Sequence, residues 1–286
     1  MKKFLILTFL LTVLTLPVRA EQPAAEKYRQ MFASGNFFVE YEVADSSSVL
    51  VYSGIFGGTK KHRHEIRAGQ NGERIAKVGS VNDKYPLALY QNGKYYKFIL
   101  DTGLAPNSMA GGIKTSKFKR YAIVIEEGNL NSPNLDPDEG WQNVRADLSL
   151  PEIFIVLFPN DPMNDAAQNF TRPIFNGSSK RTIDDKEFNC DQYISEIKSL
   201  SGAVIALEAY NILYDGDKLA RLQKYLVRDD KELLVSDLII HELSAQAPEN
   251  AFKIFKNFKL YEARNGDMND LLDSPEQLGE IGGAAQ

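Results

Sequence analysis

Few residues in this sequence could carry out acid–base or nucleophilic chemistry. The chain has three histidines, His62, His64 and His241, and one cysteine, Cys190. Nucleophilic catalysis requires an activated nucleophile with a base within hydrogen-bond reach, and the sequence contains no Gly-x-Ser-x-Gly motif. Asp191 follows Cys190, and a neighbouring acid raises the pKa of a thiol instead of activating it. We therefore expect that the protein is not an enzyme.

Two segments have the spacing of metal ligands. His62 and His64 would share one face of a strand and could bind a metal with a third ligand, although an exposed basic strand explains them equally. Residues 265–276 place side-chain oxygens at positions 1, 3, 5, 9 and 12 of a calcium-type loop. Position 6 of that loop is Asp270 where the turn requires glycine, so a solvated acidic tail is the alternative. We assign no metal and no cofactor, and expect His241 to be a hydrogen-bonded histidine within a sheet.

The N-terminus has the order of residues found in a secretory signal. Two lysines, Lys2 and Lys3, precede an apolar run of 13 residues, Phe4–Leu16. A membrane-spanning helix needs about 20 apolar residues, so a cleaved signal is favoured over a retained anchor. Small residues at the −3 and −1 positions place the cut between Ala20 and Glu21. No cysteine lies at this cut to carry a lipid, so we expect a periplasmic or secreted protein.

Composition limits the class of partner. Loss of residues 1–20, which hold three basic and no acidic residues, would change the net charge from −5 to −8. This charge argues against nucleic acid as a partner. Two basic clusters, 60–64 and 114–120, are expected in solvated loops or strand edges; the alternative is peripheral contact with anionic lipid headgroups. A single cysteine excludes an intramolecular disulfide, which favours a bacterial cell envelope.

Apolar periodicity predicts a mainly β (α+β) fold with a few helices. A helix is expected over Ala24–Ser34, followed by a strand over Phe37–Val43 in which apolar and charged residues alternate. Asn92-Gly93 lies between two apolar runs and predicts a type I′ hairpin over residues 86–100. Further strands are expected over Val49–Phe56, Arg63–Arg67, Arg74–Gly79, Tyr121–Ile125, Gln192–Ser199, Ala203–Tyr214, Leu219–Val227 and Glu232–Leu243.

Other segments lack a clear period. Residues 126–140 are acidic and rich in Pro and Asn, and are expected to form a long loop. The apolar run Leu148–Phe158 fits either a helix or a strand, and residues 159–186 are expected to be irregular. We expect one domain over residues 21–262 and a flexible tail over 263–286.

Several of these segments resemble a known family in their order along the chain. A strand beginning Gly35-Asn36-Phe37-Phe38 follows the first helix, and a Tyr90–Tyr96 hairpin comes next. Later, Tyr214-Asp-Gly-Asp-Lys-Leu-Ala-Arg-Leu222 precedes Leu238–Leu243, and the pattern closes at Pro248–Tyr261. This arrangement is similar to the periplasmic outer-membrane lipoprotein carriers of LolA, LolB and LppX type. The resemblance implies a strongly curved antiparallel open-barrel sheet wrapped around helices, with an apolar cavity.

The chain departs from the family pattern at Phe255, where proline is commoner, and in the long region 126–186. The carriers' specific role therefore does not transfer, and the expectation concerns the fold and the kind of ligand. We expect an exported binding protein for an apolar or lipidated ligand. An envelope sensor or protein-interaction module with an envelope protein partner is the alternative.

Strand alternation suggests which residues could contact such a ligand. Phe37, Val39 and Tyr41 point to one face of their strand, and Val51 and Ile55 would share that face from the next one. Plain core packing explains the same residues equally. These five are the candidate ligand-binding residues.

Overall fold

The fold is known from a computed structural model, which describes residues 23–44, 63–82, 84–101, 119–130, 142–164, 172–199, 201–228, 231–247, 250–253 and 258–262. Within these ranges the chain is mainly β, with twelve strands in one sheet. The helical elements are α2 (Pro23–Ala33), η1 (Glu127–Asn129), α4 (Gln142–Leu148) and η3 (Glu152–Val156). The strands are β1 (Phe37–Val43), β2 (Arg63–Ala68), β3 (Arg74–Gly79), β4 (Lys84–Gln91), β5 (Lys94–Asp101), β6 (Lys119–Glu126), β7 (Ile174–Ile183), β8 (Lys186–Lys198), β9 (Val204–Asp215), β10 (Lys218–Arg228), β11 (Lys231–Ser244) and β12 (Lys259–Glu262).

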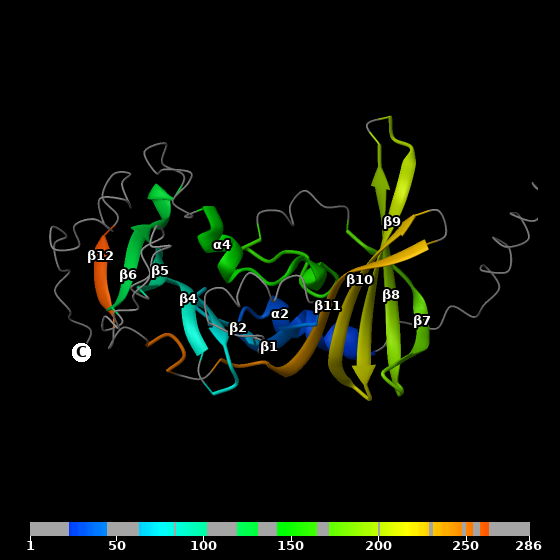
Figure 1. Cartoon of the computed structure of the whole chain (residues 1–286), viewed down its shortest axis with the longest axis horizontal. Coiled ribbons are helices and arrows are strands. Elements are labelled where there is room, and N and C mark those ends of the chain that lie inside the picture. The colour runs from blue at the N-terminus through cyan, green and yellow to red at the C-terminus, as the bar shows by residue number, and fades with distance from the viewer. Residues whose placement is uncertain are drawn as a thin grey trace, which may run out of the picture.

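The described sheet consists of two meanders joined at β1. Its strand order is β12-β6-β5-β4-β3-β2-β1-β11-β10-β9-β8-β7. Within β1 to β6 and within β7 to β11, each strand therefore pairs with the strands that precede and follow it in sequence. The joint is the antiparallel pairing of β1 with β11, in which Tyr41 lies opposite Ile240. All neighbouring pairs of described strands are antiparallel except β6 and β12, which are parallel. The order is linear and the sheet is open, with β7 and β12 at its ends (Figure 1).

Strand β1 is buried on both faces. Its predicted alternation is confirmed, since Phe37, Val39 and Tyr41 belong to the main hydrophobic core. The residues between them face the other side of the sheet, where Phe38 packs under the Arg67 guanidinium at 4.6 Å. Glu40 is also buried on that side. The charged face of β1 is therefore not a solvated one.

Helix α2 packs on the apolar face of the sheet. Its predicted position is confirmed, and Gly35, with φ of 72°, ends it in the left-handed conformation that glycine adopts readily. The Phe32 ring lies edge-on to Phe37 at 4.9 Å between centroids. The Tyr28 hydroxyl accepts a hydrogen bond from the Leu219 amide at 2.9 Å, which ties the helix to the start of β10.

Residues 142–164, here called the cover segment, lie over the same face. In this segment α4 packs on β3 and β4, and η3 packs on β10. Figure 1 shows α2 and α4 on one side of the central strands. The carboxylate of Asp161 is buried and ion-paired with Arg74 of β3, and it accepts hydrogen bonds from the amides of Leu150 at 3.0 Å and Met163 at 3.1 Å. This single carboxylate fixes both the course of the cover segment and its attachment to the sheet.

One expectation was wrong in part. Residues 174–183, within the region expected to be irregular, form strand β7. This strand has no alternating apolar pattern because it is an edge strand whose side chains are mostly exposed, with a bulge between Phe175 and Gly177. The turn that follows uses Asp184 and Asp185, both with positive φ, in place of the usual Asn-Gly. Strand β8 accordingly begins at Lys186, earlier than predicted.

The β4–β5 hairpin allows a direct test of turn chemistry. Asn92 and Gly93 have φ of 54° and 70°, as the Asn-Gly signal predicts. A Cβ on Gly93 would meet nothing within 4 Å, so Gly93→Ala is opposed by backbone conformation alone. We expect it to lower the free energy of unfolding by about 1–2 kcal/mol in urea denaturation. Gly128→Ala, also sterically free but without positive φ, is the matched control; equal effects of the two would contradict this account.

Candidate functional site

The predicted ligand-binding residues fall into three different settings. Phe37 and Val39 have 0% of their surface exposed, and the Phe37 ring packs edge-on against Phe158 of the cover segment at 6.0 Å. Tyr41 is 6% exposed and lies at the edge of the same core. Val51 and Ile55 lie outside the described residues. Of the three described residues, Tyr41 is the one that borders a pocket.

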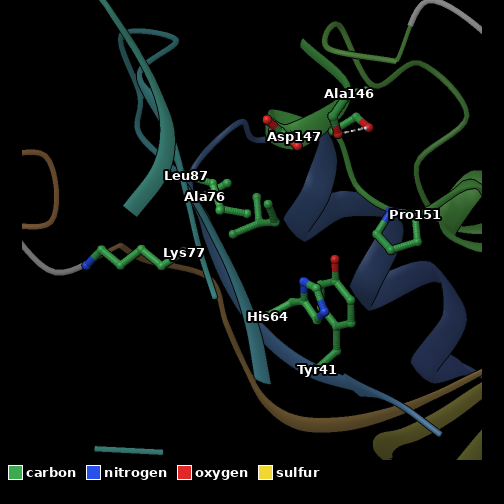
Figure 2. A pocket seen from close by; sticks show the side chains of 10 residues that line it. Tyr41, His64, Ala76, Lys77, Leu87, Ala146, Asp147 and Pro151 are labelled. Carbon is green, nitrogen blue, oxygen red and sulfur yellow. Dashed lines mark hydrogen bonds between the residues drawn. The ribbon is translucent and has the colours of Figure 1, made fainter. Parts of the chain in front are cut away.

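This pocket lies between the sheet and the cover segment and has a volume of about 150 Å³. Strands β1 to β4 form one wall, and α4 with the residues after it forms the other (Figure 2). The lining residues are Tyr41, His64, Ile66, Ala76, Lys77, Leu87, Ala146, Asp147, Ser149 and Pro151. A water molecule occupies about 30 Å³ of liquid, so the pocket has room for about five non-hydrogen atoms.

The strand wall combines apolar side chains with two polar rings. Ile66, Ala76 and Leu87 supply the apolar part. The rings of Tyr41 and His64 stack at 5.1 Å with an angle of 11° between them, and Figure 2 shows the Tyr41 hydroxyl directed toward α4. His64 was a candidate metal ligand in the sequence; in the structure it packs on tyrosine and borders this pocket.

Lys77 borders the pocket without extending into it. Figure 2 shows its side chain directed away from the other lining residues. The ammonium is 3.4 Å from Glu65 and belongs to the charges on the opposite face of the sheet. The charge of Lys77 is therefore paired with Glu65 on the opposite face of the sheet and does not extend into the pocket.

The helical wall carries a carboxylate. Burial raises the pKa of Asp147, although the positive charge of Lys97 acts in the opposite direction. The next turn is held locally, because the Ser149 hydroxyl donates to the Ala146 carbonyl oxygen at 2.8 Å (Figure 2). The sequence did not identify Asp147, since its helix has only seven residues and no long apolar period. Its burial depends on strands far away in the chain.

The opposite face of the central strands holds a group of paired charges. This charge network consists of Glu40, Glu65, Arg63, Arg67, Lys77 and Lys84. Arg67 is 2.6 Å from Glu65, and Lys84 lies between the two carboxylates, 3.0 Å from that of Glu65. Beside the network, His241 Nε2 lies 3.2 Å from Glu42, which confirms the expected hydrogen-bonded histidine. The ion pairs explain how buried carboxylates are tolerated here.

The charge network predicts how stability depends on pH. Burial alone would raise the pKa of Glu65, but the Arg67 hydrogen bond and the Lys77 charge outweigh it and lower that pKa from 4.5 to about 2. A lowered pKa in the folded state stabilises the protein above pH 4.5, and this contribution is lost as the pH falls toward 2. We expect about 3 kcal/mol to be lost over this range. Urea denaturation of wild type and Glu65→Gln should give stabilities that converge in acid.

The matched control is Glu187→Gln, because Glu187 is 58% exposed in a surface pair with Lys180. Its stability curve should run parallel to the wild-type curve, since exposed pairs contribute little. Parallel curves for Glu65→Gln would contradict the expected role of the network.

Three further findings concern the candidate chemistry. Burial raises the pKa of Cys190 to about 11, and the charge of Asp191 contributes less in the same direction. Among the described residues, no three His, Cys, Asp or Glu side chains are grouped to hold a metal ion. His62 and residues 265–276 lie outside that part of the chain. None of the described helices combines the length and the apolar character needed to cross a membrane.

A scan against models of known protein families and a search of curated proteins both found no match.

Proposed function

We propose that this chain is an exported cell-envelope protein of LolA-like fold that binds an apolar or lipidated ligand. The observation that carries the proposal is the pocket between the sheet and the cover segment, lined in part by Ile66, Ala76 and Leu87. Ligand sites are concave and combine apolar side chains with polar groups that orient the ligand, and this pocket has both, since five of its ten lining residues are apolar. The open antiparallel sheet with helices on one face is also consistent with the family resemblance.

The size of the pocket limits what it holds. Its volume of about 150 Å³ accommodates one end of a ligand and not a whole acyl chain. The cover segment is attached at Asp161 and again where Lys224 pairs with Glu152 at 2.6 Å. Both attachments lie C-terminal to α4, so we infer that a larger ligand is admitted by movement at the α4 end.

The proposal is tested by native mass spectrometry of the mature protein, beginning at Glu21, purified from a bacterial envelope. Wild-type protein should carry an added mass that organic extraction removes and identifies as lipid. Leu87→Trp should fill the pocket and reduce the bound fraction severalfold. Ile174→Trp is the matched control, because Ile174 is 71% exposed on the edge strand β7. Absence of any bound mass, or equal retention by a folded Leu87→Trp protein, would overturn the proposal.

A second function is favoured by a different surface. Val204 and Ile205 of β9 and Leu233, Leu234 and Val235 of β11, here called the apolar band, are 44–62% exposed. In Figure 1 the starts of β9 and β11 extend away from the helices. Exposed large apolar side chains are a feature of protein-interaction sites when they gather in a patch, so an envelope sensor or interaction module is the alternative. A photo-crosslinker at Leu234 that captures one envelope protein reproducibly, while one at Lys186 does not, would favour it.

A further inference from the structure

The carboxylate of Asp147 has an uncommon setting. It borders the pocket from α4 (Figure 2), on the face of the helix that packs toward β3 and β4. Among the described residues it accepts no side-chain hydrogen bond and forms no ion pair, in contrast to the buried carboxylates of Glu40, Glu65 and Asp161. Burial raises its pKa, and the nearby charge of Lys97 does not offset that rise. The carboxylate is therefore only partly solvated, and it borders the pocket without an ion-pair partner among the described residues.

The Asp147 carboxylate determines which charge a ligand in the pocket can carry. A carboxylate taken partly out of water is stabilised by an opposite charge and destabilised by a like one. An anionic group is accordingly disfavoured beside Asp147. A divalent metal is also disfavoured, because calcium requires six to eight oxygen ligands and the described pocket offers one carboxylate. The remaining class is an organic cation.

The shape and lining of the pocket narrow this class further. Room for about five non-hydrogen atoms suits an ammonium with a short alkyl stem. Opposite α4, Ala76 and Leu87 provide apolar contact for such a stem. An ammonium donates three hydrogen bonds and matches a carboxylate in charge and in hydrogen bonding.

We propose that the pocket binds the ammonium end of an amphiphilic ligand, with Asp147 as its counter-ion and with Ala76 and Leu87 against the adjoining methylenes. The inference rests on the proposed function, because it assigns the polar end of the ligand that the pocket holds. It also assigns a role to Asp147, a partly buried carboxylate that forms no ion pair and accepts no side-chain hydrogen bond among the described residues.

The test uses three short probes that differ in charge and are similar in size. Lipid-extracted mature protein is titrated with n-butylammonium, 1-butanol and butyrate and followed by NMR chemical shifts. Butylammonium should bind with a Kd on the order of 1 mM, as expected for so few atoms. Butanol should bind at least about tenfold more weakly, and butyrate should not bind detectably. Shifts should centre on Asp147 and Leu87.

Two variants test the counter-ion. Asp147→Asn keeps the size of the side chain and removes its charge, and should weaken butylammonium binding about tenfold while leaving butanol binding unchanged. Asp147→Glu should retain part of the preference for the amine. Asp185→Asn, in the exposed β7–β8 turn, is the matched control and should behave as wild type. Equal binding of butanol and butylammonium, or unchanged amine binding in a folded Asp147→Asn protein, would overturn the inference.

The outcome is separable from that of the proposed function. Lipid that co-purifies equally with wild type and Asp147→Asn, together with no amine preference, would overturn the inference and leave the carrier proposal standing. Amine binding that requires Asp147 in a protein that carries no lipid would support the amine site and contradict the carrier proposal.

Discussion

Asp161→Ala is expected to lower the free energy of unfolding by about 3–5 kcal/mol. The substitution leaves the Arg74 guanidinium buried without its carboxylate partner. It also removes the acceptor for the amides of Leu150 and Met163. A buried charge that loses its partner costs far more than the net worth of the pair, because the charge cannot return to water without unfolding. Urea denaturation followed by circular dichroism measures the difference.

Asp215→Ala is the matched control for this prediction. Asp215 pairs with Lys186 at 2.5 Å, but both side chains are more than half exposed. Removing that carboxylate should cost less than about 1 kcal/mol. A double variant, Arg74→Met with Asp161→Leu, should recover the part of the loss that comes from the unpaired Arg74 charge, while the amides of Leu150 and Met163 stay without their acceptor. Equal costs for the two single aspartate variants would show that the cover segment is not held through Asp161.

Phe37→Ala is expected to cost about 3–5 kcal/mol for a different reason. The Phe37 ring is fully buried and contacts Phe32 of α2 and Phe158 of the cover segment, so its loss leaves a cavity where three elements meet. The Arg74 guanidinium also lies over this ring at 5.1 Å and would lose that contact. Thermal and urea denaturation should both report the loss.

Phe37→Ala also tests whether Phe37 is a core residue or a ligand-binding residue, and two other variants serve for comparison. Tyr41→Phe, which removes only a hydroxyl group beside the pocket, should change stability by less than about 1 kcal/mol. Ile174→Ala, at an exposed position, should change it by less than about 0.5 kcal/mol. If Phe37→Ala left stability unchanged and abolished ligand binding, Phe37 would line a cavity that ligand occupies and would not be part of the packed core.

The sequence predicted those parts of the fold whose signals are local. The alternation in Phe37–Val43 and the Asn92-Gly93 turn each depend on residues within one hairpin, and both were confirmed. Strand β7 was missed because an exposed edge strand has little apolar pattern to detect. The joining of β1 to β11 could not be predicted from local signals, since the paired segments are separated by 199 residues.

The candidate site was predictable only in part for the same reason. Tyr41 was selected because alternation places it on the same face of its strand as Phe37 and Val39. In the structure it borders the pocket. Asp147 comes from a short helix whose depth depends on β3 and β4, so no pattern in its own segment indicates that it is buried. Phe37 and Val39 were selected by the same alternation as Tyr41 and lie deeper in the core. Alternation identifies a face of a strand, but it does not show where along that face the covering helices stop.

The position of β1 at the junction of the two meanders has a consequence for folding during synthesis. Each meander pairs neighbours in sequence, and such local hairpins can form as the chain emerges. Strand β1, however, needs β11, and a chain interrupted before residue 231 would leave one side of β1 without its partner. Strand β7 has lysine and arginine along its exposed edge, whereas β1 has no lysine, arginine or proline to oppose pairing with other chains, and its two charged residues are glutamates. Truncated products of this protein should therefore aggregate through β1, and a chaperone that holds the N-terminal meander until β11 has been synthesised should raise the yield of folded protein.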